Sequence, residues 1–451
     1  MTHRPVATPH DRRANPIHPR KPAHAHIRGP AKWLVLAYMA GDNDLESFAV
    51  GDIKEMEKVG SRPGEVDVVV QIDRAAGYDR SDGDWEGTRR YYVTRGADKR
   101  RINSRLLADL GETNTGDPEV LEEFLDFGIS SYPAKACALV LWNHGSGFYV
   151  PPEMLAKPGA ASRREVVSRA TPRLRRTLFH TTRERLLQLD PQRRGIAYDD
   201  RSGDCLDNQE LKRVLGSAHQ LLGRKVDLVG MDACLMTMLE VAYQIRDHAQ
   251  ILVGSEEVEP GDGWPYDAVL RELTAHPDMT GRDLATTIVR RYAESYRQRR
   301  MEVTQSAIDL SKLDPLVDAV DRLAGALINR LRTPGVEAAI YAAWRRTLRF
   351  FDNFYIDLHH FASNLAAATD AGEIKAACGG VVRAIEGKGA ESPIIEASHC
   401  GARMAPAQGL SIYFPPFRDP SAFYRDLDFA RRARWAEFLE AYLGNGRKGV
   451  R

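Results

Sequence analysis

Apolar runs of strand length alternate with segments of helical periodicity through the first half of the chain. Trp33–Met39 and Val66–Ile72 are near-continuous apolar runs, each as long as one buried strand. Between them, apolar residues recur over positions 45–56 at the three- and four-residue spacing of one helix face. Asp42–Asp44 precedes this segment and predicts a turn and a helix N-cap. The alternation predicts βαβ units, with a mostly parallel sheet covered by helices on both faces.

The alternation of strand and helix patterns continues after a hairpin or edge strand predicted at Trp85–Thr94. Further elements expected from the pattern are a helix from Pro118, helices over 208–222 and 235–248, strands ending just before His144 and Cys234, and a strand over 251–253. From about residue 270 the pattern is mainly helical. We therefore predict an α/β fold with a disordered tail at 1–31, an α/β domain at 32–300 with an insertion at 150–195, and a mostly helical subdomain at 301–451.

The charge and cysteine content narrow the classes of protein to consider. The 63 basic and 62 acidic residues give a net charge of +1, so no overall field attracts nucleic acid or an anionic membrane. No apolar run approaches the length of about 18 residues that spans a bilayer. Residues 1–31 lack the apolar core of a secretory signal, and the five cysteines form no CxxC pair. These features predict a cytoplasmic protein without structural disulfides.

Two reactive side chains follow predicted buried strands. The run Ala138–Trp142 leads into Asn143 and His144, and the run Val226–Asp232 leads into Cys234. Ligands of open α/β sheets bind outside the carboxyl ends of the strands, so residues placed there indicate chemistry. A cysteine paired with a histidine is typical of nucleophilic catalysis. The predicted helix after Cys234 would also lower the pKa of its thiol through the helix dipole.

Six blocks of the chain resemble the clostripain family of cysteine peptidases, in the order of that family. They are Tyr38–Glu46, Trp142–Gly147, Gly195–Asp200, Met231–Met236, Glu257–Trp264 and Gly409–Pro416. The resemblance implies a caspase-like αβα sandwich and a catalytic pair formed by His144 and Cys234. Cys234 would attack the scissile carbonyl while His144 transfers the proton. The backbone N–H groups of Gly145 and Cys234 would bind the oxyanion, and the glycine allows the substrate to approach closely.

The resemblance also implies cleavage after Arg or Lys of a peptide or protein substrate. Asp232 and Asp262 match acidic positions of the first specificity pocket, where a carboxylate would bind a guanidinium. Alternatively, Asp232 caps the following helix and Asp262 shapes a glycine-rich turn. Glu256, Glu257 and Glu259 would add an acidic rim.

The segment Lys157–Arg194 carries eleven basic residues and three acidic ones. A peptidase that prefers Arg or Lys is expected to cut itself there, although a solvated surface insertion has the same composition. The sequence leaves the oligomeric state open.

No cofactor is expected, because the chain has neither GxGxxG nor GxxxxGK[ST], and His359 and His360 are adjacent on a predicted helix. Some relatives of the family need calcium, for which Asp199, Asp200 and Asp204 are candidate ligands. Two alternatives to the basic-specific peptidase are an inactive binding or adaptor protein and a peptidase of the same fold with non-basic specificity.

Overall fold

A nine-stranded sheet forms the centre of the computed structural model, which describes residues 29–148, 195–350, 354–387, 391–415 and 420–446. The strand order is β13-β10-β9-β8-β5-β1-β2-β3-β4. The five strands from β9 to β2 run parallel, and two antiparallel strands extend the sheet on each side. Its strands are β1 (Ala31–Gly41), β2 (Val66–Arg74), β3 (Gly87–Tyr92), β4 (Arg105–Gly111), β5 (Ala134–Trp142), β8 (Leu228–Asp232), β9 (Ile251–Gly254), β10 (Val303–Asp309) and β13 (Ile394–Cys400).

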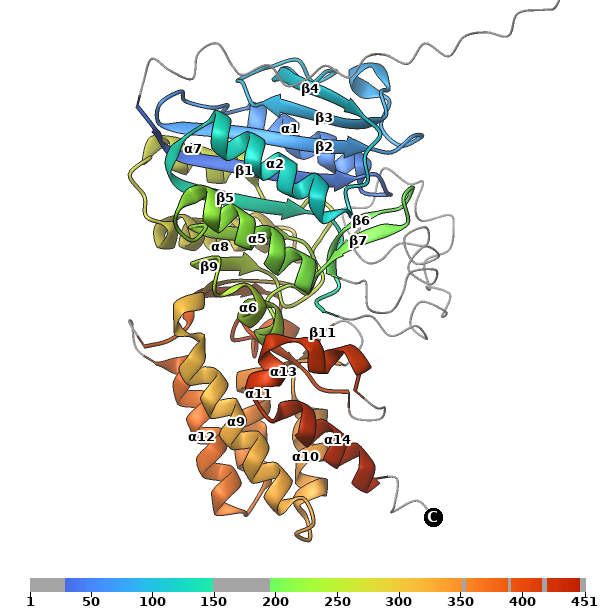
Figure 1. The fold of residues 1–451 in the computed structure, drawn as a ribbon. Helices are drawn as coiled ribbons and strands as arrows, with labels where there is room; N and C mark the ends of the chain where they lie inside the picture. The colour runs from blue at the N-terminus through green and yellow to red at the C-terminus, as the bar shows by residue number, and fades with distance from the viewer. Residues whose placement is uncertain (1–28, 149–194, 351–353, 388–390, 416–419, 447–451) are drawn as a thin grey trace, which may run out of the picture.

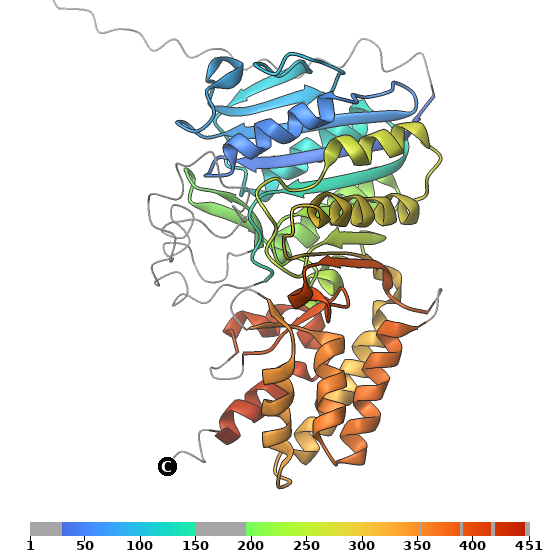
Figure 2. The ribbon, with the colours of Figure 1, turned by 180° about the vertical axis from the view of Figure 1, so that it is seen from behind.

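Helices cover both faces of this sheet (Figures 1 and 2). One face packs against α2 (Pro118–Ser131), α5 (Asn208–Leu222) and α6 (Leu239–Ile245). The other packs against α1 (Glu46–Glu57), α7 (Tyr266–Ala275) and α8 (Gly281–Arg297). The period of two along a strand sends Leu36 and Tyr38 of β1 to the first core and Ala37 and Met39 to the second. The predicted αβα sandwich is confirmed.

The carboxyl-terminal part is a group of helices beside the β9–β13 end of the sheet (Figure 1). It contains α9 (Leu313–Arg330), α10 (Val336–Arg346), α11 (Leu358–Ala368), α12 (Gly372–Glu386), α13 (Asp428–Arg432) and α14 (Trp435–Gly446). A small sheet of β11 (Arg349–Phe350), β12 (Tyr355–Asp357) and β14 (Ser411–Tyr413) joins it to α6 through a bridge between Met238 and Ser411. Strands β10 and β13 come after residue 300 in the chain but are part of the nine-stranded sheet. The domain boundary predicted at residue 300 therefore divides the strands of this sheet.

One predicted helix is wrong at its start. The pattern predicts a helix over 235–248, whereas α6 spans Leu239–Ile245. The N–H groups of Leu235 and Thr237 bond to the carbonyl oxygens of Glu257 and Ser255, at 3.4 and 3.1 Å. These bonds keep residues 235–237 out of the helical conformation, so the first helical turn forms only after Met238. No helix among the described residues has the length and hydropathy to span a membrane.

Candidate active site

Adjacent parallel strands bring His144 and Cys234 together. Strands β5 and β8 pair in register, with Trp142 opposite Asp232, so each of the two side chains lies two residues beyond the end of its strand. Gly145 lies against the backbone of Cys234, where an added Cβ atom would sit 2.3 Å from the Cys234 carbonyl oxygen. Only glycine fits this contact without a shift of the backbone. His144 has no exposed surface and Cys234 is 2% exposed.

A carboxylate from a third strand end orients the histidine. Nε2 of His144 lies 2.7 Å from Oδ1 of Asp44, which follows β1, the other neighbour of β5. Asp44 belongs to the turn that the sequence predicts as a cap for α1, but the N-cap of that helix is Leu45, without a side-chain cap. The sequence patterns do not single out this pair, although the rule that placed His144 and Cys234 at strand ends applies equally to Asp44. The contact with Asp44 fixes the orientation of the imidazole ring.

Asparagine side chains hold the strand ends around His144. Asn143 accepts a hydrogen bond from the N–H of Tyr198 at 2.9 Å and donates through Nδ2 to the carbonyl oxygen of Ala40. Asn43 donates to the carbonyl oxygen of Tyr198 at 2.8 Å. Tyr198 lies in β6 (Gly195–Asp199), which pairs with β7 (Asp204–Asp207). These hydrogen bonds therefore tie the ends of β1, β5 and β6 together.

Cys234 lies in a tight turn and not at a helix N-terminus. Leu235, the next residue, has a φ of +66°, a conformation that costs a branched side chain free energy. The N–H of Glu259 donates to Sγ of Cys234 at 3.3 Å. This backbone N–H group, and not the N-terminus of a helix starting at Leu235, therefore faces the sulfur.

The other cysteines lack this setting. Cys137, Cys205, Cys378 and Cys400 are buried and, like Cys234, form no disulfide. Burial raises the pKa of Cys137 and of Cys378 to about 12, which disfavours their thiolates.

The proposed oxyanion donors are the backbone N–H groups of Gly145 and Cys234, which lie where Gly145 packs against the backbone of Cys234. Gly145 forms a β-bridge with Ile196, and the bridge is made through the N–H of Ser146, which donates to Gly195 at 3.0 Å. The bridge therefore does not use the N–H of Gly145. The oxyanion role of Gly145 and Cys234 stays a prediction.

The two acidic residues expected to bind a basic side chain lie in different surroundings. Asp232 is fully buried, and its Oδ2 accepts a hydrogen bond from Tyr266 Oη at 2.8 Å and one from the N–H of Trp264 at 3.4 Å. It does not cap α6, which starts seven residues later. Asp262 is exposed and pairs with Arg299.

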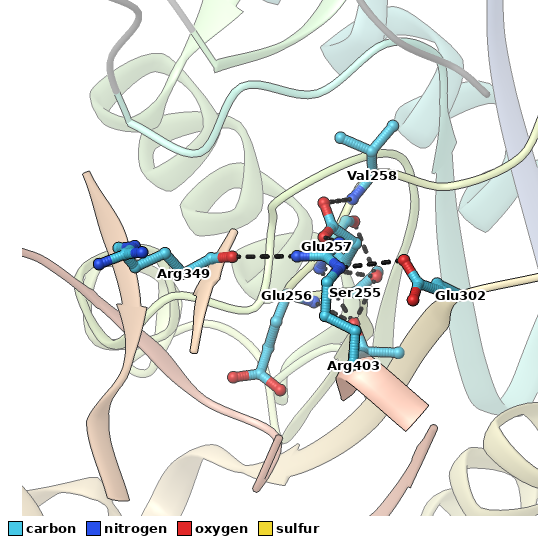
Figure 3. A network of polar contacts seen from close by, with 8 residues as sticks. Ser255, Glu256, Glu257, Val258, Glu302, Arg349 and Arg403 are labelled. Atoms are coloured by element: carbon cyan, nitrogen blue, oxygen red, sulfur yellow. Dashed lines mark hydrogen bonds and ion pairs between the residues drawn. The ribbon is translucent and has the colours of Figure 1, made fainter. Parts of the chain in front are cut away.

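A network of polar contacts joins the segment after β9 to the carboxyl-terminal part (Figure 3). Arg403 pairs with the carboxylate of Glu257, donates to Glu302 at 2.9 Å and donates to the Arg349 carbonyl oxygen at 3.4 Å. The Oε1 atom of Glu257 accepts a bond from the N–H of Val258 at 2.9 Å. This network fixes the segment that contacts Cys234.

The expected acidic rim is wrong. Glu256, Glu257 and Glu259 are at most 2% exposed, so they lie inside the protein.

The residues suggested as calcium ligands do not converge. Within the described residues, the one group of three potential ligands whose atoms lie within 4.8 Å of one another is Asp42, Asp73 and Asp199. Asp204 instead accepts a hydrogen bond from Asn114 at 2.8 Å. Burial and the neighbouring carboxylates raise the pKa of Asp42 to about 7 and that of Asp73 to about 9.

A cysteine beside a histidine, at the carboxyl ends of two parallel strands in an αβα sandwich, defines the class of cysteine peptidases with a caspase-like fold. The sequence profile of the clostripain family matches residues 37–157 and 185–442. The chain belongs to this family of cysteine-type endopeptidases.

Comparison with individual proteins agrees with this assignment. The clostripain of Hathewaya histolytica is 26% identical over 347 residues, which are 68% of this chain and 58% of that protein. The chain thus spans less than two thirds of the length of this curated relative. A secreted C11 cysteine protease of Bacteroides thetaiotaomicron, solved with an irreversible peptide inhibitor, has a TM-score of 0.60 at 18% identity and covers 90% of this chain and 100% of its own. An inactive zymogen C11 protease of Parabacteroides distasonis has a TM-score of 0.58 at 20% identity, covering 90% and 98%. At these identities the structures support the fold alone.

Proposed function

We propose that the protein is an active endopeptidase that hydrolyses peptide bonds after Arg or Lys, with Cys234 as nucleophile and His144 as general base and acid. The observation that carries the proposal is the register of β5 and β8, which sets His144, Gly145 and Cys234 at one edge of the sheet. Family membership supports the same reaction.

The reaction follows from the positions of these groups. His144 takes the proton of Cys234 through Nδ1, and the sulfur attacks the scissile carbonyl carbon. The backbone N–H groups of Gly145 and Cys234 stabilise the negative oxygen of the tetrahedral intermediate. His144 then gives its proton to the departing amine, which leaves a thioester that water hydrolyses. Asp44 keeps the imidazole oriented and stabilises its protonated form.

The preference for a basic residue rests on Asp232 and Asp262. A buried carboxylate such as Asp232 gains most from a guanidinium, because the charge-assisted bond forms away from water. Asp262 is exposed, so its pair with Arg299 exchanges readily for a substrate cation at the entrance. Tyr266 holds the Asp232 carboxylate in a fixed orientation.

Self-cleavage within Lys157–Arg194 would activate the enzyme. This segment lies outside the described residues, and the proposal depends on its basic sequence. The burial of His144 and Cys234 supports an activation step, since a substrate needs access to both side chains. One structural relative is an inactive zymogen, so members of this fold include unactivated forms.

Two experiments test the function. Wild type, Cys234→Ala and His144→Ala are assayed on fluorogenic peptides with Arg, Lys, Asp, Asn or Leu before the scissile bond. We expect cleavage of the Arg and Lys peptides by wild type alone. Cleavage after other residues would replace the basic specificity, and no cleavage by any form would favour the adaptor alternative.

Fragment masses test self-cleavage separately. Wild type is expected to yield two associated fragments cut between residues 157 and 194, whereas Cys234→Ala stays intact. Identical intact chains in both preparations would refute self-cleavage without affecting the peptide result.

A further inference from the structure

Two buried hydroxyl groups form a pair beside the segment that contacts Cys234. Ser255 directly follows β9, and Thr304 lies in β10, the strand that pairs with β9. Their hydroxyl oxygens lie 2.9 Å apart, and the two residues are 0% and 2% exposed. Figure 3 shows Ser255 together with Glu256 and Glu257, which follow it in the chain. The reaction proposed above uses neither hydroxyl, so the pair requires another explanation.

All the hydrogen-bonding capacity of the pair is used within one turn. Oγ1 of Thr304 accepts hydrogen bonds from the N–H groups of Glu256 and Glu257, at 3.1 and 3.0 Å. Oγ of Ser255 donates to the carbonyl oxygen of Glu257 at 2.8 Å and accepts from the N–H of that residue at 3.1 Å. A hydroxyl has one donor, so the Thr304 hydroxyl donates to Ser255. The pair thus fixes the backbone of residues 255–257.

This 255–257 turn holds the backbone that follows Cys234. The N–H groups of Leu235 and Thr237 donate to carbonyl oxygens of the 255–257 turn, at 3.4 and 3.1 Å. Slightly further along the same segment, the N–H of Glu259 donates to Sγ of Cys234 at 3.3 Å. Leu235 has a φ of +66°, which is costly for a branched side chain, so its conformation depends on the surrounding bonds.

The hydroxyl at position 304 is not needed to build the strand. Strand β10 joins β9 and β13 through backbone pairing, with Ser306 opposite Gly254 and Thr304 opposite His399. Valine has nearly the same shape as threonine and also favours strands. It would, however, remove an acceptor from the buried N–H group of Glu256, which costs free energy. The hydroxyl therefore serves the 255–257 turn.

We propose that Thr304 is a positioning residue for the nucleophile, acting through Ser255 and the 255–257 turn on the backbone that carries Cys234. Its hydroxyl fixes this turn, the turn fixes residues 235–237, and the same segment sets the N–H of Glu259 against the sulfur. A strand outside the pair that carries His144 and Cys234 thus controls the geometry of the nucleophile. The effect on catalysis rests on the proposed function, whereas the effect on the backbone does not.

Amide hydrogen exchange tests the effect on the backbone. The full chain is used with His144→Ala, which keeps the sulfur of Cys234 and removes self-cleavage. Adding Thr304→Val replaces the hydroxyl by a methyl group, so the amides of residues 235–237 should exchange about tenfold faster or more. Adding Thr304→Ser instead keeps the hydroxyl and should leave exchange close to that of the parent.

Matched variants keep this test decisive. Thr274 is 6% exposed and its hydroxyl donates to the carbonyl oxygen of Leu270 at 2.8 Å within α7, so Thr274→Val also removes a buried hydroxyl. It should leave exchange at residues 235–237 within about twofold of the parent. Ser255→Ala gives an independent measure if Thr304→Val does not fold. Parental exchange at residues 235–237 in a folded Thr304→Val or Ser255→Ala would overturn the proposal, as would equal acceleration there by Thr274→Val.

Kinetics on an Arg peptide test the consequence for catalysis. Thr304→Val should lower kcat about tenfold or more while KM changes less than about threefold, because the hydroxyl acts through the nucleophile. Thr304→Ser should regain most of the lost kcat. Adding Ser255→Ala to Thr304→Val should cost little more, since the two hydroxyls act as one unit.

The two measurements separate the possible failures. Wild-type kcat in Thr304→Val would refute positioning of the nucleophile even if exchange is faster, and so would a failure of Thr304→Ser to recover activity. If wild type itself cuts no peptide, the proposed function fails, and the exchange result still decides whether the hydroxyl holds the backbone after Cys234.

Discussion

Individual residues around His144 have separable roles, and Asp44 gives the first prediction. Asp44→Asn should lower kcat about tenfold or more, because an amide neither stabilises the imidazolium nor fixes the same tautomer. Stability should change little, since Asn keeps the size of the side chain. Kinetics on an Arg peptide measure the effect. Asp117→Asn is the control, since Asp117 caps α2 and Asn caps a helix equally well. Wild-type kcat in Asp44→Asn would remove the residue from the mechanism.

Gly145 gives the second prediction, which depends on shape alone. Gly145→Ala places a methyl group 2.3 Å from the Cys234 carbonyl oxygen, so the two strand ends must separate. We expect loss of most activity and a lower Tm, measured by peptide hydrolysis and thermal unfolding. Gly51→Ala is the matched control, because Gly51 lies in α1 with no atom within 4 Å of the added Cβ. That change should stabilise the protein by about 0.5–1 kcal/mol.

At the scale of secondary structure, the sequence is informative where an element is governed by its own pattern. Helix α5 begins at Asn208 and ends at Leu222 as predicted, because Asp207 forms a capping box with Glu210 and Gly223 has the left-handed conformation of a C-cap. Both strands that lead to His144 and Cys234 are also where the apolar runs predict them.

The predictions fail where the backbone forms hydrogen bonds with residues that are far away in the sequence. Helix α6 starts late because Thr237 bonds both Ser255 and Ser411, at 3.1 and 3.0 Å. These partners belong to other elements and leave no signal near Cys234. Local sequence patterns also cannot predict the contact between Asp44 and His144 or the proximity of Asp73 and Asp199. The two residues of each pair are about 100 or more positions apart in the chain.

The segment after β9 gives a prediction at this scale. Arg403→Ala leaves the Glu257 carboxylate buried without its cation, which costs about 1–3 kcal/mol after allowance for the partial exposure of Arg403. The segment that donates to Sγ of Cys234 should loosen, so we expect a lower Tm and a lower kcat.

A double variant identifies the cause. Adding Glu257→Gln to Arg403→Ala removes the unpaired charge, and it should restore most of the lost Tm. A double variant less stable than Arg403→Ala would show that the loss comes from packing and not from charge.

One of the two cores runs from a face of the sheet into the carboxyl-terminal helices, so we expect the two parts of the molecule to unfold together. Leu36 of β1, Leu215 of α5, Leu323 of α9 and Trp435 of α14 belong to one continuous apolar cluster. Glu240 of α6 lies within this junction. Its Oε1 accepts hydrogen bonds from the N–H of Tyr413 at 3.0 Å and from Tyr424 Oη at 2.7 Å. Burial raises its pKa to about 7.

This carboxyl group predicts how the stability of the junction depends on pH. The folded protein holds the Glu240 proton up to a pKa of about 7, whereas the unfolded chain loses it near 4.5, the ordinary value. Folding therefore binds more protons between these values, so the stabilisation is present below about pH 4.5 and is lost as the pH rises through 7. Glu240→Gln keeps the acceptor oxygen and removes the titration.

Urea unfolding at pH 5 and pH 8 measures this contribution. From pH 5 to pH 8, wild type should lose about 2–3 kcal/mol more stability than Glu240→Gln. Glu391→Gln, at an exposed position, should follow wild type at both pH values. Because Tyr413 and Tyr424 both belong to the carboxyl-terminal part, the expected loss weakens its attachment to the sheet. If the stabilities of wild type and Glu240→Gln changed equally with pH, Glu240 would already be ionised in the folded protein. Its titration would then not affect how firmly the carboxyl-terminal part is held to the sheet.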